Sequence, residues 1–105
     1  MKMSFQANKE ITADELAQRL ERGEDLNIVD VREPVEWEEA HIPGSKHIPL
    51  GQLPERFEEL DREKEWFVVC RSGGRSGLAC ELLTEKGYDA VNMTGGLLAW
   101  RSELV

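Results

Sequence analysis

The sequence contains little of what disulfide-stabilised folds and metal sites are built from. Its 105 residues include two cysteines, Cys70 and Cys80, and two histidines, His41 and His47. Two cysteines cannot make a framework of disulfides, and a reducing compartment keeps them as thiols. No Cys-x-x-Cys pair occurs, and the two histidines are not at a zinc-ligand spacing. We therefore expect no metal site.

Long apolar runs are also missing. No stretch approaches the roughly 18 apolar residues of a membrane-spanning helix. The opening residues, MKMSFQANKE, lack the apolar core of a secretory signal peptide. The expectation is a cytoplasmic protein that makes no contact with a membrane.

Positive charge is scarce. The 13 Lys and Arg residues stand against 21 Asp and Glu residues, which gives a formal net charge of -8. A surface of this sign repels nucleic acids and anionic membranes, so we expect neither as a partner. Arg71 and Arg75 nevertheless lie close together in the chain. They either reverse the field locally or are ordinary solvated side chains.

The length of the chain fits one domain. No internal repeat, low-complexity tract or linker divides it, so residues 1–105 are predicted to form a single domain. Within it, residues 1–8 are predicted to be a loosely ordered segment or a short strand.

Hydrophobic periodicity and turn residues predict strands that alternate with helices. Thr12 and Glu15 have the spacing of a capping box, which predicts a helix that ends at Gly23. The apolar run from Trp66 to Val69 is typical of a strand covered on both faces, as in a parallel sheet. Such alternation implies parallel strands joined by right-handed crossovers, an α/β fold. Further strands are predicted at 26–31, 46–48 and 90–93, and further helical segments at 33–40, 54–60, 78–87 and 97–101.

The segment VVCRSGGRSG, residues 68–77, places a thiol at the end of a predicted strand. Cys70 precedes a glycine-rich turn and then a helix on which Leu78, Ala79, Leu82 and Leu83 repeat at helical spacing. Ligand sites of open α/β sheets lie at this carboxyl edge. The glycines allow backbone N–H groups to turn inward around an anion, and the helix start adds the positive end of its dipole. Together with the two arginines, these groups predict that Cys70 is a solvent-exposed thiolate at neutral pH.

Four motifs carry a resemblance to a known family. Residues 70–76, CRSGGRS, are similar to the active-site loop of the rhodanese (sulfurtransferase) family. DVRE at 30–33 with EW at 36–37 resembles that family's first motif, and HIPGS at 41–45 with HIP at 47–49 resembles its second. MTGG at 93–96 with AW at 99–100 resembles its C-terminal motif. The matches keep the family's order from about Ile11 to Trp100, nearly the whole chain.

The resemblance implies a single-domain rhodanese fold, with a small parallel sheet of four or five strands and helices on both faces. It also implies a thiosulfate sulfurtransferase-like enzyme. Cys70 would take a sulfane sulfur from an anionic donor such as thiosulfate, hold it as a persulfide, and pass it to a thiol or cyanide. The resemblance implies no cofactor. A sulfur-relay protein is a further candidate partner, and a monomer is expected.

The same resemblance assigns roles to the residues around Cys70. Arg71 and Arg75 would attract the donor and stabilise the departing sulfite. Asp30 and Arg32 would be supporting residues, either a structural ion pair or a brace behind the loop. Backbone N–H groups of the loop would hold the sulfur, from Ser72, Gly73, Gly74 and Ser76.

Two other functions are weighed against sulfur transfer. Protein tyrosine phosphatases have a loop one residue longer between cysteine and arginine, which surrounds a phosphate. The shorter loop between Cys70 and Arg75 favours a single sulfur atom over phosphatase or arsenate-reductase chemistry. The remaining alternative is a rhodanese-like binding module without catalysis, which the presence of the cysteine disfavours.

Several residues outside the loop receive structural roles. Cys80 is predicted to be a structural thiol, with a resolving or regulatory role as the alternative. His41 and His47 are predicted to fix turns through hydrogen bonds. The acidic run of Glu36, Glu38 and Glu39 is predicted to be a solvated face, with repulsion or selection of partners as the alternative. The pair Gly95 and Gly96 is predicted to let the backbone approach the active loop closely.

Overall fold

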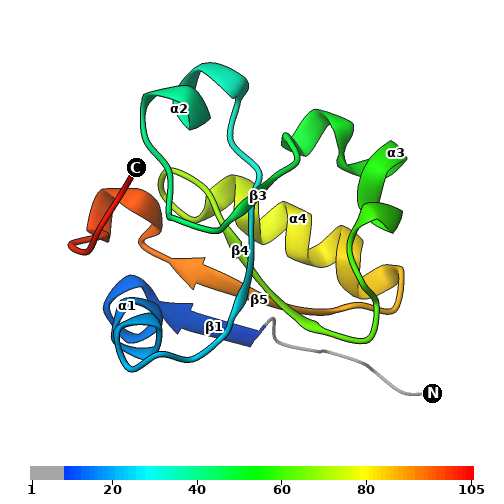
Figure 1. Cartoon of the computed structure of the whole chain (residues 1–105). Coiled ribbons are helices and arrows are strands. Elements are labelled where there is room, and N and C mark those ends of the chain that lie inside the picture. The colour runs from blue at the N-terminus through cyan, green and yellow to red at the C-terminus, as the bar shows by residue number, and fades with distance from the viewer. Residues whose placement is uncertain (1–8) are drawn as a thin grey trace.

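The computed structural model describes residues 9–105, and the segment predicted at residues 1–8 lies outside this range. Five parallel strands form one sheet in the order β1-β5-β4-β2-β3. The predicted α/β fold, with a small parallel sheet and helices on both faces, is confirmed (Figure 1). The strands are β1 (Lys9–Thr12), β2 (Asn27–Asp30), β3 (Lys46–His47), β4 (Glu65–Val69) and β5 (Asp89–Thr94).

Helical segments follow the strands and return the chain to the start of the sheet. The α-helices are α1 (Ala13–Glu21), α2 (Pro34–Glu39), α3 (Leu53–Arg56) and α4 (Gly74–Glu85). Three short 3₁₀ turns accompany them: Leu50–Gln52, Phe57–Glu59 and Gly96–Ala99. The predicted helix at 97–101 is instead a 3₁₀ turn over Gly96–Ala99. Gly95, which precedes the turn, and Gly96, which begins it, both hold left-handed backbone angles.

The capping box that predicts α1 is present. The Glu15 amide donates to the Thr12 hydroxyl oxygen at 3.1 Å, and the Thr12 amide donates to the Glu15 carboxylate at 3.2 Å. Two backbone donors that the helix leaves free are thus satisfied by side chains. Thr12 is also the last residue of β1, so the chain turns from strand to helix without a loop.

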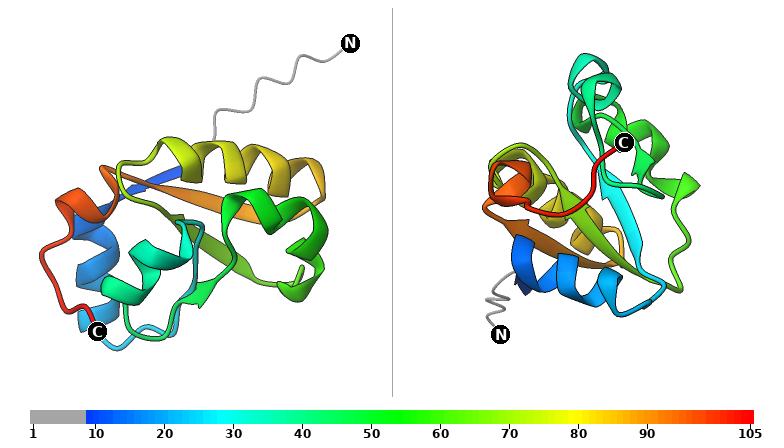
Figure 2. Two further views of the ribbon diagram at one scale, coloured as in Figure 1. Left: turned by 90° about the horizontal axis from the view of Figure 1, so that it is seen from above. Right: turned by 60° about the vertical axis from the view of Figure 1, so that its left-hand side comes forward.

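The sheet separates two hydrophobic clusters, as Figure 2 illustrates by placing α1 and α4 on opposite sides. Along β4, Phe67 and Val69 pack on the α1 side, while Trp66 and Val68 pack toward α4. This alternation follows from the two-residue period of a strand. Cys70 continues it and belongs to the α4 side. The Cys70 side chain therefore lies on the face of the sheet that α4 covers, and α4 is the helix that follows the Cys70 loop.

The predicted apolar stripe of α4 is wrong at one position. Leu78 is 58% exposed, whereas Ala79, Cys80 and Leu83 are fully buried. Successive helix residues are about 100° apart, so a helix that buries Ala79 and Leu83 turns Leu78 toward solvent.

The carboxyl end of the chain is tied back to the segment after α2. The His41 amide donates to the Val105 carbonyl at 2.9 Å, and the Val105 amide donates to the His41 carbonyl at 2.8 Å. Among the described helices, none is both long enough and apolar enough to cross a bilayer.

Candidate active site

Cys70 lies at the carboxyl edge of the sheet, between the end of β4 and the start of α4. Residues 71–73 form the connection (Figure 1), and Gly73 has a φ of 106°, a left-handed conformation that glycine adopts without a Cβ penalty. The side chain is fully covered, with 0% exposure. The prediction of a solvent-exposed sulfur is therefore wrong for this conformation, because the loop folds over the atom that it surrounds.

Polar groups rather than hydrocarbon contact the Cys70 sulfur on its loop side. The Gly73 amide donates to Sγ at 3.1 Å, and the Ser76 amide donates to it at 3.2 Å. The Ser76 hydroxyl oxygen lies 3.3 Å from Sγ. These donors come from the left-handed turn and from the first turn of α4, where amides have no partner within the helix.

The pKa of Cys70 reflects two opposing effects. Burial raises it, since a thiolate loses water on transfer into the protein. Hydrogen bonds from the Ser76 hydroxyl and from the amides of Ser76, Gly73 and Ser72 lower it, and together they prevail. The pKa of Cys70 thus lies below that of an ordinary cysteine, which favours the nucleophilic form.

Asn92 on β5 completes this polar cluster, and sequence reasoning missed it. Its Oδ1 accepts a short hydrogen bond from the Ser76 hydroxyl, and its Nδ2 donates to the Gly73 carbonyl at 3.2 Å. The side chain is buried. An asparagine inside the apolar strand Ala90–Met93 was the available signal, because a buried amide needs partners on both its oxygen and its nitrogen.

Arg75 does not extend freely toward the space above the loop. Its Nη1 and Nη2 donate to the Glu36 carboxylate at 2.8 Å and 3.0 Å. The Arg75 hydrogen bonds lower the pKa of Glu36 to about 2, and the Glu33 amide also contributes, while burial opposes both. The prediction of a solvated acidic face is therefore wrong for Glu36, whereas Glu38 and Glu39 are exposed. No sequence pattern linked residues on α2 and α4, because the contact depends on how the two helices are placed.

Arg71 differs from Arg75. Its side chain is exposed, and no carboxylate pairs with it among residues 9–105. Ser72 and Gly74 are also exposed. Of the two loop arginines, Arg71 is thus the one whose positive charge is exposed to solvent and is not neutralised by a carboxylate of the described chain.

The turn after β5 holds the loop from the other side, as the glycine pair predicts. The Leu97 amide donates to the Cys70 carbonyl at 2.9 Å, and the Leu98 amide donates to the Arg71 carbonyl at 3.0 Å. A Cβ on Gly96 would overlap the Arg71 carbonyl group. Only a glycine permits this approach, so the motif at 93–96 sets the position of the loop.

Asp30 and Arg32 form a buried ion pair. Arg32 Nε lies 3.0 Å from both carboxylate oxygens of Asp30, and its Nη2 donates to the Ala40 carbonyl at 2.7 Å. Neither residue has a hydrogen bond or ion pair with the Cys70 loop among residues 9–105. They hold the ends of the segment that carries α2, and thereby Glu36.

The two histidines make the hydrogen bonds of turn-fixing residues. His41 Nδ1 lies 2.8 Å from the Trp37 carbonyl, and His47 Nε2 lies 2.8 Å from the Arg32 carbonyl. Both rings stack on the Trp37 indole, with centroid distances of 3.5 Å and 4.8 Å. The stack connects α2, which carries Trp37, to the edge strand β3, which carries His47.

Cys80 is buried, and desolvation raises its pKa to about 12. A thiol of this kind stays protonated at neutral pH, which fits the predicted structural role.

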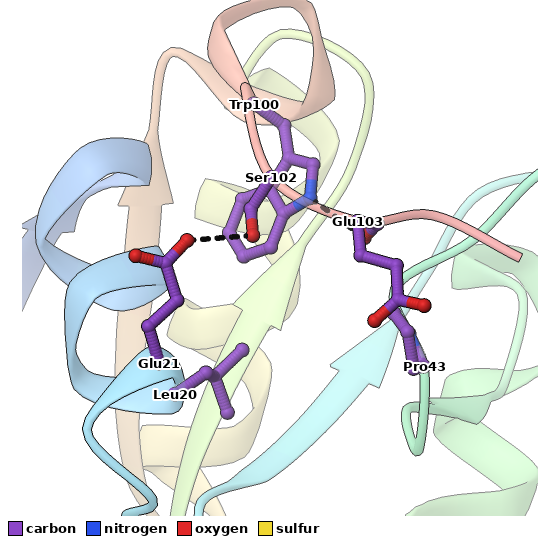
Figure 3. Close-up of a pocket in the computed structure, with 6 residues that line it drawn as sticks. All are labelled: Leu20, Glu21, Pro43, Trp100, Ser102 and Glu103. Atoms are coloured by element: carbon purple, nitrogen blue, oxygen red, sulfur yellow. Dashed lines mark hydrogen bonds between the residues drawn. The ribbon is translucent and has the colours of Figure 1, made fainter.

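A pocket between the end of α1 and the carboxyl-terminal segment contains none of the predicted site residues. Figure 3 shows its lining, in which the Ser102 hydroxyl donates to the Glu21 carboxylate at 2.9 Å. The lining residues are Leu20, Glu21, Pro43, Trp100, Ser102 and Glu103. The candidate site is therefore the polar cluster around Cys70 and not this pocket.

Comparison with known proteins agrees with this geometry. The family model described as the rhodanese-like domain matches residues 12–103. The chain is a rhodanese-like domain. "Putative sulfurtransferase YtwF" of Bacillus subtilis is 44% identical over 95 residues, which cover 90% of this chain and 92% of that protein. A protein of Allochromatium vinosum named "Sulfurtransferase" is 39% identical over 92 residues, 87% of this chain and 86% of that one.

The rhodanese-like domain also matches part of a longer relative. "Putative sulfur carrier protein YrkF" of B. subtilis is 41% identical over 92 residues, which cover 87% of this chain and 50% of that protein. Among solved structures, a rhodanese-like domain protein from Staphylococcus aureus superposes with a TM-score of 0.87 at 38% identity. The match covers 92% of this chain and 96% of that one.

Proposed function

We propose that this rhodanese-like domain is a sulfurtransferase in which Cys70 carries a sulfane sulfur as a persulfide. The observation that carries the proposal is the polar surroundings of Sγ: two amides donate to it at 3.1 Å and 3.2 Å, and the Ser76 hydroxyl oxygen lies 3.3 Å away. Such an environment stabilises a sulfur anion. Relatives named sulfurtransferases support the same chemistry.

The first half-reaction consumes the thiolate. Cys70 Sγ attacks the outer sulfur of thiosulfate, the sulfur–sulfur bond of the donor breaks, and sulfite leaves with its electron pair. The products are a Cys70 persulfide anion and the sulfite dianion, so charge and atoms balance. No general base is needed, because the nucleophile is already deprotonated.

The second half-reaction regenerates the thiolate. A thiolate or cyanide attacks the outer sulfur of the Cys70 persulfide, and the original Sγ leaves as an anion. The same amides of Gly73 and Ser76 then receive this charge. The site is thus built to stabilise an anion at the beginning and at the end of the cycle.

Access to the sulfur requires a movement of the loop, because Cys70 is fully covered. Arg71, Ser72 and Gly74 are its exposed members. Arg71, whose charge is unpaired within the described chain, would draw an anionic donor to this point. Ordinary low-molecular thiols or a protein of a sulfur relay would accept the sulfur. We place this activity in the cytoplasm, with the domain acting as a monomer.

An intact-mass experiment tests the proposal. Incubation with thiosulfate should add the mass of one sulfur atom, cyanide should remove it, and Cys70→Ala should take up none. Retention of the full uptake by Cys70→Ala would exclude the proposed carrier. Hydrolysis of an aryl phosphate without sulfur uptake would instead favour phosphatase chemistry, and tight capture of a protein with neither activity would favour a binding module.

A further inference from the structure

We infer that Glu36 is a specificity-determining residue that makes the site discriminate against donors with two negative charges. The inference rests on the proposed sulfur transfer and refines its substrate class. The favoured donors are sulfane-sulfur compounds with a single negative charge or none, such as thiosulfonates and thiol persulfides.

Glu36 cancels one of the two positive charges of the active loop. Arg75 is the second residue of α4, and the amide of the next residue, Ser76, donates to Cys70 Sγ at 3.2 Å. Both terminal nitrogens of Arg75 are occupied by the two carboxylate oxygens of Glu36, at 2.8 Å and 3.0 Å. A guanidinium held in this bidentate way has no equivalent pair of terminal donors left for an incoming dianion.

A second hydrogen bond and partial burial accompany the pair. Glu36 Oε1 also accepts a hydrogen bond from the Glu33 amide at 2.9 Å, so the carboxylate is anchored to the start of α2. The side chains of Arg75 and Glu36 are only 33% and 24% exposed. Their charges are therefore less screened by water than those of a surface pair.

The negative member of the pair acts on the donor according to the donor's charge. A dianion is repelled by Glu36 twice as strongly as a monoanion at the same place, and Arg75 offers it only the donors that Glu36 leaves free. Arg71 attracts both donors, but its side chain is exposed and more strongly screened. The electrostatic interactions at the loop therefore favour donors of lower negative charge.

Two sulfur donors that react with the same thiolate but differ in charge allow the effect of donor charge to be measured. Thiosulfate is a dianion, and methyl methanethiosulfonate is neutral. When the Cys70 thiolate attacks the outer sulfur of thiosulfate, the sulfur–sulfur bond breaks, sulfite leaves with the electron pair, and Cys70 holds a persulfide anion. When it attacks the methylthio sulfur of the neutral donor, methanesulfinate leaves with the electron pair, and Cys70 holds a methyl disulfide. Each reaction conserves charge, and no added oxidant or reductant takes part.

The test compares the second-order rate constants for modification of Cys70 by thiosulfate and by methyl methanethiosulfonate, in the wild type and in Glu36→Gln. Glutamine keeps an oxygen that accepts from Arg75 but carries no charge. We expect the thiosulfate-to-thiosulfonate ratio to rise about fivefold at low salt, the size of effect that one partly screened charge has on a donor charge. About 0.5 M salt should remove most of the increase.

Glu39→Gln is the matched control. It changes the net charge equally and lies on the same helix, but it is exposed and forms no ion pair in the described chain. Its ratio should stay within about twofold of the wild type, as expected for a screened surface charge. An unchanged ratio in Glu36→Gln, or an equal rise in both variants, would overturn the inference.

A second comparison covers the case in which Glu36→Gln does not fold. Arg75→Gln exposes the Glu36 charge and should lower the ratio, and Arg75→Gln/Glu36→Gln should raise it again about fivefold. Equal ratios in these two variants would also overturn the inference. Failure of both thiosulfate and a low-molecular thiol persulfide to load sulfur onto Cys70 of the wild type at any salt concentration would refute the proposed function instead, so the two failures are distinguishable.

Discussion

At the residue scale, the site is governed by competition between burial and hydrogen bonding at one sulfur atom. Burial disfavours the thiolate of Cys70, and donors from Ser76, Gly73 and Ser72 favour it. The Ser76 hydroxyl has one proton, which it can give either to Sγ or to Asn92 Oδ1. When Cys70 ionises, the Ser76 hydroxyl can therefore donate its proton to the thiolate instead of to Asn92 Oδ1.

Ser76→Ala tests this competition. Loss of the hydroxyl removes a stabilising contact from the thiolate and leaves burial unchanged, so we expect the pKa of Cys70 to rise and sulfur uptake at neutral pH to slow about tenfold. The pH profile of alkylation measures the change. Because the thiolate is the reactive form, the rate rises with pH, and in the variant that rise should move to higher pH.

Ser72→Ala is the control for this variant. It removes a hydroxyl from the same loop, but Ser72 acts on the sulfur through its backbone amide, which alanine retains. Alkylation should stay confined to one thiol in both variants, because the pKa of Cys80 is about 12. Coincident pH profiles for Ser76→Ala and the wild type would contradict the assigned role of Ser76.

At the scale of elements, the loop is positioned by three separate pieces of chain. The 3₁₀ turn Gly96–Ala99 holds the carbonyls of Cys70 and Arg71, and α2 holds the first turn of α4 through Arg75. β5 reaches the loop through Asn92. Of the glycines in the described chain, Gly96 is the one at which an added Cβ would come closest to another atom, the Arg71 carbonyl oxygen.

Gly96→Ala tests the importance of this approach. The new Cβ would overlap the Arg71 carbonyl, and alanine is strained at a φ of 61°. We expect a loss of about 3 kcal/mol in the free energy of unfolding and a loss of sulfur uptake. Thermal unfolding and intact mass measure the two effects.

Gly44→Ala provides the comparison. Gly44 has a φ of 80°, but a Cβ added there would meet no atom within 4 Å, so only backbone strain is introduced. A loss of about 1 kcal/mol with normal sulfur uptake is expected. The role of Gly96 in positioning the loop would be wrong if both variants loaded sulfur equally well.

The sequence predicts those features that depend on local patterns. The capping box at Thr12, the strand at 66–69 and the turn that follows Cys70 each follow from a few adjacent residues. The partners of the loop depend on packing between distant segments. Glu36 and Arg75 are 39 positions apart, and Ser76 and Asn92 are 16 apart, so their contacts arise only when the sheet places α2, α4 and β5 around one edge.

At the scale of the whole molecule, the active loop sits in a protein of net charge -8. This field repels anionic donors at long range, and Glu36 adds to the repulsion by neutralising Arg75. Arg71 is the local opposing charge. The effect of salt on the rate of donor loading should therefore show whether attraction by Arg71 or repulsion by the rest of the surface is stronger.

Arg71→Ala should reverse that dependence. In the wild type, added salt screens the attraction of Arg71 for thiosulfate and slows loading. In the variant only repulsion remains, so salt should accelerate loading, by about threefold between low salt and about 0.3 M. Stopped-flow measurement of sulfite release follows the reaction.

Arg62→Ala changes the net charge equally at a distant place. Arg62 lies over the Tyr88 ring, just beyond the far end of α4 from the loop. In Arg62→Ala, added salt should slow thiosulfate loading, as it does in the wild type. The same effect of salt in Arg71→Ala would show that Arg71 does not control the approach of the donor.

The strand order has a consequence for the synthesis of this protein. β1 is the first described strand to leave the ribosome, yet its hydrogen-bonding neighbour is β5, which ends at Thr94. A nascent chain must therefore carry β1 without a partner while the three intervening strands are made. Completion of the sheet is consequently expected to wait until β5 has emerged, rather than to keep pace with elongation.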